Sequence, residues 1–159
     1  MAINVLELDD FESDNFNIIA IHTNLEAYRL AYLINQKAQI SLEKSLNNLE
    51  LSKFGLKTSF EHFMFEDKNN QIFWSLVANY SFTTKLGYTN DYELCELKEL
   101  SEITLVPEYA DVSFFLKIEE TQNKPYITNL LRELSTIDHV QKTFEIDKNT
   151  LVSINNLLF

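Results

Sequence analysis

Glycine and proline are scarce in this chain of 159 residues, which contains only two of each. Together they make up roughly 12% of an average protein. A Walker loop or a dinucleotide-binding G-x-G-x-x-G motif needs closely spaced glycines, and Gly55 and Gly87 lie too far apart for either. Tight glycine turns are also too few for a sandwich or propeller built of many hairpins. The composition therefore excludes glycine-loop nucleotide sites and disfavours hairpin-rich folds.

Basic residues and cysteine are also few. Thirteen Lys and Arg stand against 24 Asp and Glu, and the net charge of -11 repels phosphates and anionic lipid. We therefore expect no nucleic acid and no membrane as partner. The single cysteine, Cys95, forms no internal disulfide and indicates a reducing compartment. The acidic N-terminus lacks the basic region of a signal peptide, and no apolar run approaches the roughly 20 residues of a membrane helix. A soluble cytoplasmic protein is expected.

Acidic residues gather in two clusters. We interpret both as solubilising surface, and a site for a cation or a basic partner is the alternative. The clusters are Glu7, Asp9, Asp10, Glu12 and Asp14, and then Asp91, Glu93, Glu96, Glu99 and Glu102.

The N-terminal part of the chain predicts a strand followed by a helix. The apolar run Phe16–Ile21 is rich in β-branched residues, which is typical of a buried strand. Thr23 and Glu26 have the spacing of a capping box, in which the two side chains satisfy free backbone N–H groups. Apolar residues then recur at helical spacing, so we expect a helix from about Asn24 to Ala38.

The rest of the chain predicts more strands, a second helix and two stretches without assignment. Alternating residues indicate a hairpin, and we expect its Asn-containing connection to supply the left-handed backbone that glycine often provides. Ser81 to Asn90 is expected to be a loop. The sequence assigns no definite helix or strand to residues 45–58 and 81–102. The predicted elements are a short strand at Ile40–Lys44, a hairpin of Ser59–Glu66 with Gln71–Tyr80, strands at Ile103–Val106, Val112–Ile118 and Val140–Ile146, a helix from Pro125, and a short helix within Lys148–Phe159.

This order of elements predicts one α+β domain spanning residues 1–159. Strand–helix–strand order occurs at both ends, in Phe16–Lys44 and Val112–Ile146, with antiparallel strands between them. Two principal helices are then expected to pack on one face of a mainly antiparallel sheet. A ferredoxin-like arrangement and a duplicated βαβ half are the two more specific interpretations.

Residue types suited to catalysis or metal binding form no recognisable motif. His22, His62 and His139 lack metal-ligand spacing, and Cys95 has no sequence signature of a nucleophile. We therefore expect no metal and no cofactor. His22 ends a strand just before a helix N-terminus, where a side chain can meet a ligand beside free N–H groups, and a capping or surface histidine is the alternative. His62 alternates with Phe63 and is expected on the solvent face of its strand.

Residues Val106–Phe114 read Val-Pro-Glu-Tyr-Ala-Asp-Val-Ser-Phe. This segment resembles the signature of the IPExxxVDY family, small bacterial proteins known mainly from the Bacteroidetes and named for that motif. Pro107, Glu108 and Val112 match it, Val106 replaces its Ile, and Ser113 and Phe114 replace its Asp and Tyr. The family has no assigned activity, so the resemblance implies no mechanism. The two departures argue against an indispensable catalytic Asp or Tyr at these positions.

The motif also has a physical interpretation. Pro107 fixes its own φ and pushes Val106 toward extended geometry, which favours a rigid connection that sets strand register. In the alternative interpretation Glu108 recognises a cationic or hydrogen-bond-donor group, with Arg29 as a candidate inside the chain.

We expect a non-enzymatic binding, interaction or regulatory protein of a bacterial cytoplasm, with a protein or small molecule as partner. His22, Arg29 and Glu108 are the candidate ligand- or partner-binding residues. A homodimer is expected because aromatic-rich strands need covering. The alternative is a small enzyme in which His22 and Glu108 meet within hydrogen-bond reach in a concave pocket.

Overall fold

The fold is built on a six-stranded sheet. The computed structural model describes residues 15–53, 56–85, 99–119 and 124–159. The strand order is β10-β1-β9-β6-β5-β2, and every neighbouring pair is antiparallel. The strands are β1 Phe16–Thr23, β2 Glu43–Lys44, β5 His62–Asp67, β6 Ile72–Ala78, β9 Phe114–Glu119 and β10 Val140–Ile146.

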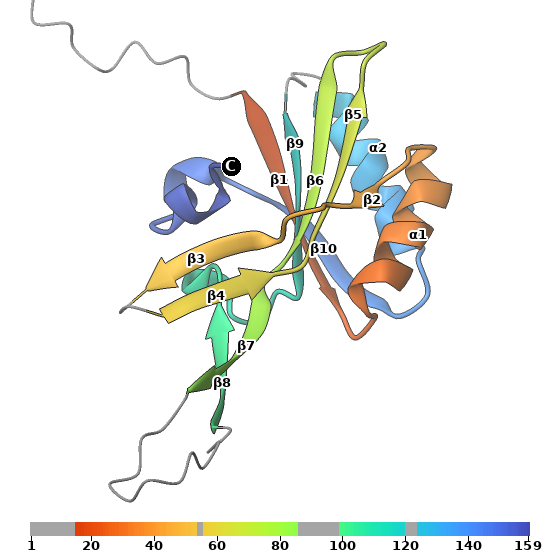
Figure 1. Cartoon of the computed structure of the whole chain (residues 1–159). Helices are drawn as coiled ribbons and strands as arrows, with labels where there is room; N and C mark the ends of the chain where they lie inside the picture. The colour runs from red at the N-terminus through yellow and green to blue at the C-terminus, as the bar shows by residue number, and fades with distance from the viewer. Residues whose placement is uncertain (1–14, 54–55, 86–98, 120–123) are drawn as a thin grey trace, which may run out of the picture.

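Both α-helices lie on the same face of this sheet (Figure 1). They are α1, Ala27–Ala38, and α2, Lys124–Ser135. Each presents a stripe of buried aliphatic residues to the sheet, as an amphipathic helix does. The core between helices and sheet includes Ile19, Ile21, Leu30, Ile34, Trp74, Leu116, Leu130 and Leu134. The predicted α+β class, with two helices on one face of an antiparallel sheet, is confirmed.

Two strand–helix–strand units interlock in the sheet. The first consists of β1, α1 and β6, and the second of β9, α2 and β10, which places the four strands in the order β10-β1-β9-β6. This is the ferredoxin-like split βαβ arrangement. Residues 39–71 are inserted between α1 and β6, so the strand that completes the first unit is β6. The expected strand at 40–44 is instead the two-residue edge strand β2.

The other face of the sheet is covered by smaller elements, namely the two-stranded ribbon of β3 (Leu49–Lys53) and β4 (Leu56–Phe60) and two C-terminal 3-10 helices (Figure 1). The 3-10 helices are η3, Lys148–Thr150, and η4, Ile154–Leu157, in place of the predicted C-terminal α-helix. A second core forms here, including Ile18, Phe60, Val77, Phe115, Ile146 and Leu157. The stretch 45–58, which the sequence left unassigned, therefore contributes to covering the sheet.

A second ribbon, β7 (Tyr80–Lys85) with β8 (Glu99–Thr104), extends away from the sheet (Figure 1). The expected loop at Ser81–Asn90 is thus wrong as far as Lys85, because that segment pairs with β8. The expected features of residues 86–98, and most of both acidic clusters, lie outside the described residues.

The start of α1 differs from the predicted capping box. The helix begins at Ala27, and its N-cap Glu26 makes no side-chain capping hydrogen bond. The Thr23 hydroxyl accepts from the backbone N–H of Leu25 at 3.1 Å and donates to the carbonyl of His139 at 2.8 Å. Thr23 therefore joins β1 to the turn before β10, which its sequence spacing does not reveal.

Among the described residues, three that are not glycine adopt the left-handed backbone conformation. They are Gln39, Gln71 and His139, with φ of 55°, 55° and 70°. In the β5–β6 turn this conformation falls on Gln71 and not on the preceding asparagines. Because an L-residue other than glycine pays a steric cost of about 1–2 kcal/mol there, the scarcity of glycine leaves strain at these positions.

Replacing His139 by glycine is expected to raise the melting temperature. His139→Gly removes the steric cost of φ 70°, and the gain of up to about 1 kcal/mol corresponds to roughly 2–4 °C for a chain of this size. The matched control is the neighbouring Asp138→Gly, which adds backbone freedom without relieving a positive φ and should lower the melting temperature. Calorimetry of the two variants checks this, and a lower melting temperature for His139→Gly would contradict it.

Candidate functional site

The segment that resembles the family motif, Val106–Phe114, connects the second ribbon to β9 and continues into that strand. Pro107–Tyr109 is a single 3-10 turn, η2, with Val106 before it in extended conformation. Val106 and Val112 are buried, whereas Glu108 is exposed. Pro107 opens the turn, and both valines are buried in the second core. The rigidity of this connection stays a prediction.

Asn79, which directly follows β6, holds both ends of this motif. Its side chain is fully buried; the amide Nδ2 donates to the carbonyls of Tyr109 at 3.0 Å and Val112 at 2.8 Å, and Oδ1 accepts from Val106 N–H at 2.9 Å. The Asn79 backbone bonds Leu105 and Ser113 as well. No sequence pattern identified Asn79, because its five partners are 26 to 34 residues away, and only the fold brings them together.

Ser113, at the position of the motif's Asp, ties the motif to the end of β1. Its hydroxyl donates to the carbonyl of Thr23 at 2.7 Å and accepts from the Thr23 N–H at 3.1 Å. A short hydroxyl side chain therefore performs a structural role here, pairing with both backbone groups of one residue.

Glu108 binds the chain's own C-terminal turn. Its Oε1 accepts from the backbone N–H of Ser153 at 2.5 Å. Partial burial raises the pKa of the Glu108 carboxyl, but hydrogen bonds from its own backbone and from Val152 and Ser153 outweigh this effect and hold the pKa below its usual value. Glu108 thus stabilises a turn as a carboxylate.

His22 and Arg29 do not join Glu108 in a common site. The Nδ1 of His22 donates to the backbone carbonyl of Asp111, within the motif. Arg29 lies exposed on α1, and within the described ranges it forms no salt bridge with Glu108. The described contacts of His22 and Glu108 go to backbone groups, so these side chains form no acid–base pair.

A pocket opens at the opposite end of β6. It has a volume of about 500 Å³, within the usual range for small-molecule sites. Three separate segments build it: the end of α1 with the residues after it, the β5–β6 turn, and the first turn of α2. The described lining residues are Ala38, Gln39, Ile40, Asp67, Asn70, Ile72, Trp74 and Tyr126.

Two aromatic rings and one carboxylate give this pocket its chemistry. Trp74 and Tyr126 meet edge to face, with ring centroids 6.3 Å apart. Burial raises the pKa of the Tyr126 hydroxyl, and the nearby charge of Asp67 adds to that rise. The pKa of Asp67 is lowered, mainly because the side chain and backbone of Asn70 donate hydrogen bonds to its carboxylate. The pocket therefore presents a fixed anion beside aromatic and aliphatic surface.

These pocket residues were not identified from the sequence. The sequence pattern places Trp74 in a hairpin and Tyr126 at the start of a helix. The alternation of β6 does place Trp74 on the helix-covered face, but the approach of Tyr126 and Asp67 depends on where α2 packs. The pocket is thus a product of tertiary structure.

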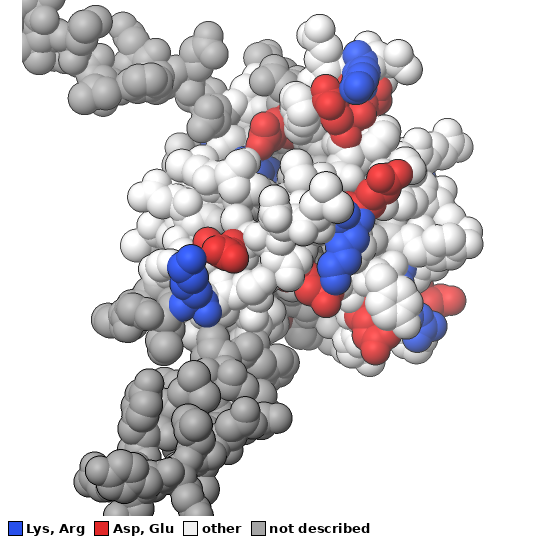
Figure 2. All heavy atoms as spheres, in the orientation of Figure 1, with Lys and Arg blue, Asp and Glu red and all other residues white. Residues whose placement is uncertain are grey.

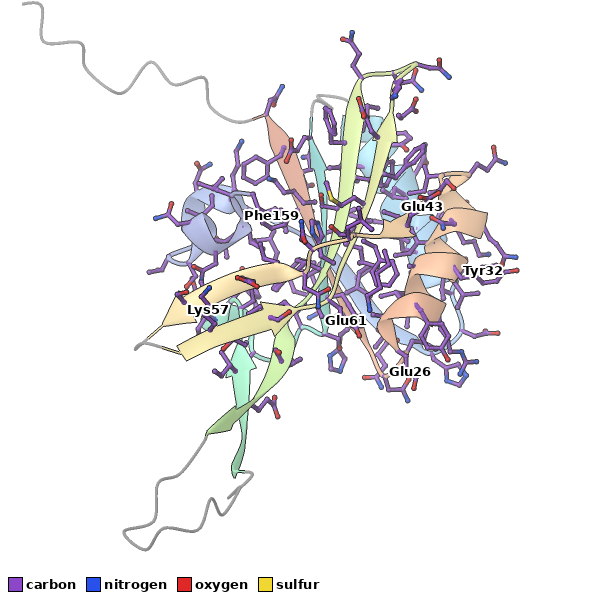
Figure 3. All side chains as sticks on the ribbon, viewed as in Figure 1. Glu26, Tyr32, Glu43, Lys57, Glu61 and Phe159 are labelled. Carbon is purple, nitrogen blue, oxygen red and sulfur yellow. The ribbon has the colours of Figure 1, made fainter. Side chains whose placement is uncertain are left out.

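A buried charge lies under the C-terminal residues. Lys117 is 4% exposed, forms a salt bridge to Glu119 at 2.6 Å, and lies 4.9 Å from the ring centroids of Phe16 and Phe159. Phe159 lies in front of the sheet strands in Figure 3. The two rings and the carboxylate together compensate the burial of the ammonium group.

His62 lies in the same region, and its predicted solvent exposure is wrong. The side chain is 5% exposed and packs edge to face on Phe159. Its buried Nε2 has no hydrogen-bond partner among the residues that the structure describes. The expectation failed because the second face of β5 is covered by C-terminal residues. Burial, and then the charge of Lys117, lower the pKa of His62.

Charges on the described surface are mixed in sign. The face shown in Figure 2 carries acidic and basic side chains close together, separated by wide uncharged areas. Two exposed salt bridges, Lys44–Glu61 and Lys57–Glu50, belong to this pattern. In the described ranges no group of three or more His, Cys, Asp or Glu side chains is arranged to hold a metal ion.

The outer edges of the sheet bear on the expected homodimer. One edge is the two-residue strand β2, and the other is the seven-residue strand β10, which pairs with β1. Exposed tyrosines, including Tyr32 on the outer side of α1 in Figure 3, add apolar surface. The homodimer stays a prediction.

Comparisons with protein-family models, with curated proteins and with solved structures found no match to this chain. The resemblance of Val106–Phe114 to the IPExxxVDY signature therefore stays a prediction. In the part of the chain that the structure describes, no helix is both long and apolar enough to cross a membrane.

Removing the Asn79 amide is expected to destabilise the protein strongly. Asn79→Ala leaves the N–H of Val106 and the carbonyls of Tyr109 and Val112 without these partners, and should lower the free energy of unfolding by about 3 kcal/mol. Asn156→Ala removes a single hydrogen bond to the carbonyl of Leu105 and should cost about 1 kcal/mol. Urea unfolding compares the two, and equal losses would refute the central role of Asn79.

His62 is expected to make the stability of the protein fall as the pH drops below about 6.5, the usual pKa of histidine. Its folded-state pKa is lowered, so the unfolded chain takes up a proton below its own value near 6.5 while the folded chain does not. Stability is therefore full above pH 6.5 and falls as the pH drops toward the folded-state pKa. Thermal unfolding of His62→Phe should show a flatter profile. His139→Asn retains His62 and should retain the wild-type slope; a flat wild-type profile would overturn this assignment.

Proposed function

We propose that this protein is a non-enzymatic binding module that takes a small molecule in the pocket between α1, the β5–β6 turn and α2. The observation that carries the proposal is the pocket of about 500 Å³ lined by Trp74, Tyr126 and Asp67. The lining combines aromatic and aliphatic side chains with the polar side chains of Gln39, Asp67 and Asn70, and such polar groups orient a ligand in protein sites.

The contacts of His22 and Glu108 favour binding over catalysis. An acid–base enzyme at His22 and Glu108 needs both side chains to face one substrate. Each instead bonds a backbone group of the chain, His22 at Asp111 and Glu108 at Ser153. The motif is then a structural connection at one end of β6, and the ligand pocket lies at the other end.

The resemblance to the IPExxxVDY signature and the single cysteine support a bacterial cytoplasmic setting for this function. A regulatory role follows naturally from the same geometry, because the pocket spans both helices and the hairpin. A bound molecule would hold these three segments together and stabilise the folded state by mass action.

Trp74 offers a direct readout, because it is the only tryptophan of the chain and it lines the pocket. We expect at least one compound from a panel of amines, amino acids, carboxylates and nucleosides to raise the melting temperature and to change Trp74 fluorescence. Ala38→Phe, which fills the pocket, should abolish both effects. Lys37→Phe adds the same ring on the preceding residue, outside the described lining, and should preserve them. If no compound of the panel binds, or if the compounds that bind also bind Ala38→Phe, the proposal that this pocket is a ligand site is refuted.

A further inference from the structure

The Asp67 carboxylate is fixed before any ligand arrives. Its Oδ1 accepts from the backbone N–H groups of Asn69 at 3.1 Å and Asn70 at 3.2 Å, and its Oδ2 accepts from the Asn70 amide at 2.7 Å. Across the described ranges Asp67 forms no salt bridge. The carboxylate therefore stays ionised at neutral pH and has no basic partner there to compensate its charge.

The exposed ring of Tyr126 is suited to a positive charge, whereas the adjoining Trp74 is 1% exposed. The face of an aromatic ring carries partial negative charge and attracts a cation that lies within about 6 Å of its centroid. Tyr126 is 36% exposed at the pocket, in contact with the ring of Trp74. Ile40 and Ile72 add aliphatic surface, and neither lysine nor arginine is among the described lining residues.

The net charge of the whole protein also favours a positively charged ligand. A net charge of -11 raises the local concentration of cations and repels anions. A hard metal ion fits the pocket poorly, because such ions need several oxygen ligands, and Asp67 is its single described carboxylate.

We propose that the pocket selects a small organic cation, a protonated amine or quaternary ammonium group on an apolar body. The ammonium group contacts the Asp67 carboxylate and the Tyr126 ring, and the apolar body lies against Ile40, Ile72 and the edge of Trp74. The amides of Gln39 and Asn70, also at the pocket, accept hydrogen bonds from N–H groups of the ligand. This inference rests on the proposed function and specifies the chemistry of its ligand.

The test compares cations with neutral molecules of the same shape. Suitable pairs are choline with 3,3-dimethylbutan-1-ol and benzylamine with benzyl alcohol, titrated against Trp74 fluorescence and by calorimetry at low salt. We expect the cation of a pair to bind about tenfold more tightly. Raising the salt concentration should weaken the cation and leave the alcohol unchanged, because the Asp67 contact is near the surface.

The variant Asp67→Asn tests the contribution of the Asp67 negative charge to ligand binding. Asparagine keeps an oxygen that accepts from the turn N–H groups, so the β5–β6 turn should be preserved, and the circular dichroism spectrum and melting temperature verify this. We expect the variant to lose the tenfold preference while it binds the alcohol as before. Asp138→Asn removes the same charge from a residue outside the described pocket lining and should leave the preference intact.

Two results would overturn the cation preference. Equal binding of both members of each pair refutes it and leaves the proposed binding function standing. Binding of carboxylates or nucleosides, with no cation bound, refutes it in the same way. If no compound of any class binds and Trp74 fluorescence never changes, the proposed function fails together with this inference.

Discussion

The buried amide of Asn79 is the contact on which the arrangement of the motif depends. A polar side chain that is fully buried must find hydrogen-bond partners, and Asn79 finds them at both ends of the segment from Leu105 to Ser113. This segment is thereby held against the end of β6. From that position Ser113 reaches the backbone of Thr23, and Glu108 reaches the backbone of Ser153. The Asn79 side chain thus holds the segment through which the ends of two strands and the C-terminal turn are connected.

The two ends of β6 have different roles as a consequence. At the end marked by Asn79, the polar side chains are engaged with backbone groups and hold the fold together. At the start of the strand, Trp74 lies at the base of a pocket whose carboxylate, Asp67, is held by the turn and is not neutralised by a described salt bridge. A rigid scaffold with a polar group positioned at its edge is the usual arrangement of a binding site.

The second face of the sheet shows how a small domain accommodates a buried charge. Lys117 lies among Phe16, Phe159 and Glu119, and His62 packs on the same Phe159 ring. The C-terminal residues therefore exclude water from β5 and β9 and change the protonation behaviour of a histidine whose strand position alone suggested exposure. Contacts between residues distant in the chain decide burial here, and burial decides the pKa.

The sequence by itself determined the α+β class, the strand at 16–21, the hairpin around residue 70, the helix after Pro125 and the strand at 140–146, because these depend on local periodicity, β-branched residues and turn-forming residues. It also placed Pro107 at a connection between elements, where the structure has the 3-10 turn η2. It did not reveal the strands at 49–53 and 56–60, because apolar and polar residues alternate there over too few positions to distinguish a strand from a helix. Nor did it reveal the role of Thr23, whose partner His139 is 116 residues away. Only the tertiary structure brought Asn79 to the motif, gave His22 and Glu108 different backbone partners, and placed Tyr126 and Asp67 beside Trp74. The physical reason is that side-chain partners and burial are set by packing between distant segments, whereas the sequence pattern records which face of its own element a residue occupies.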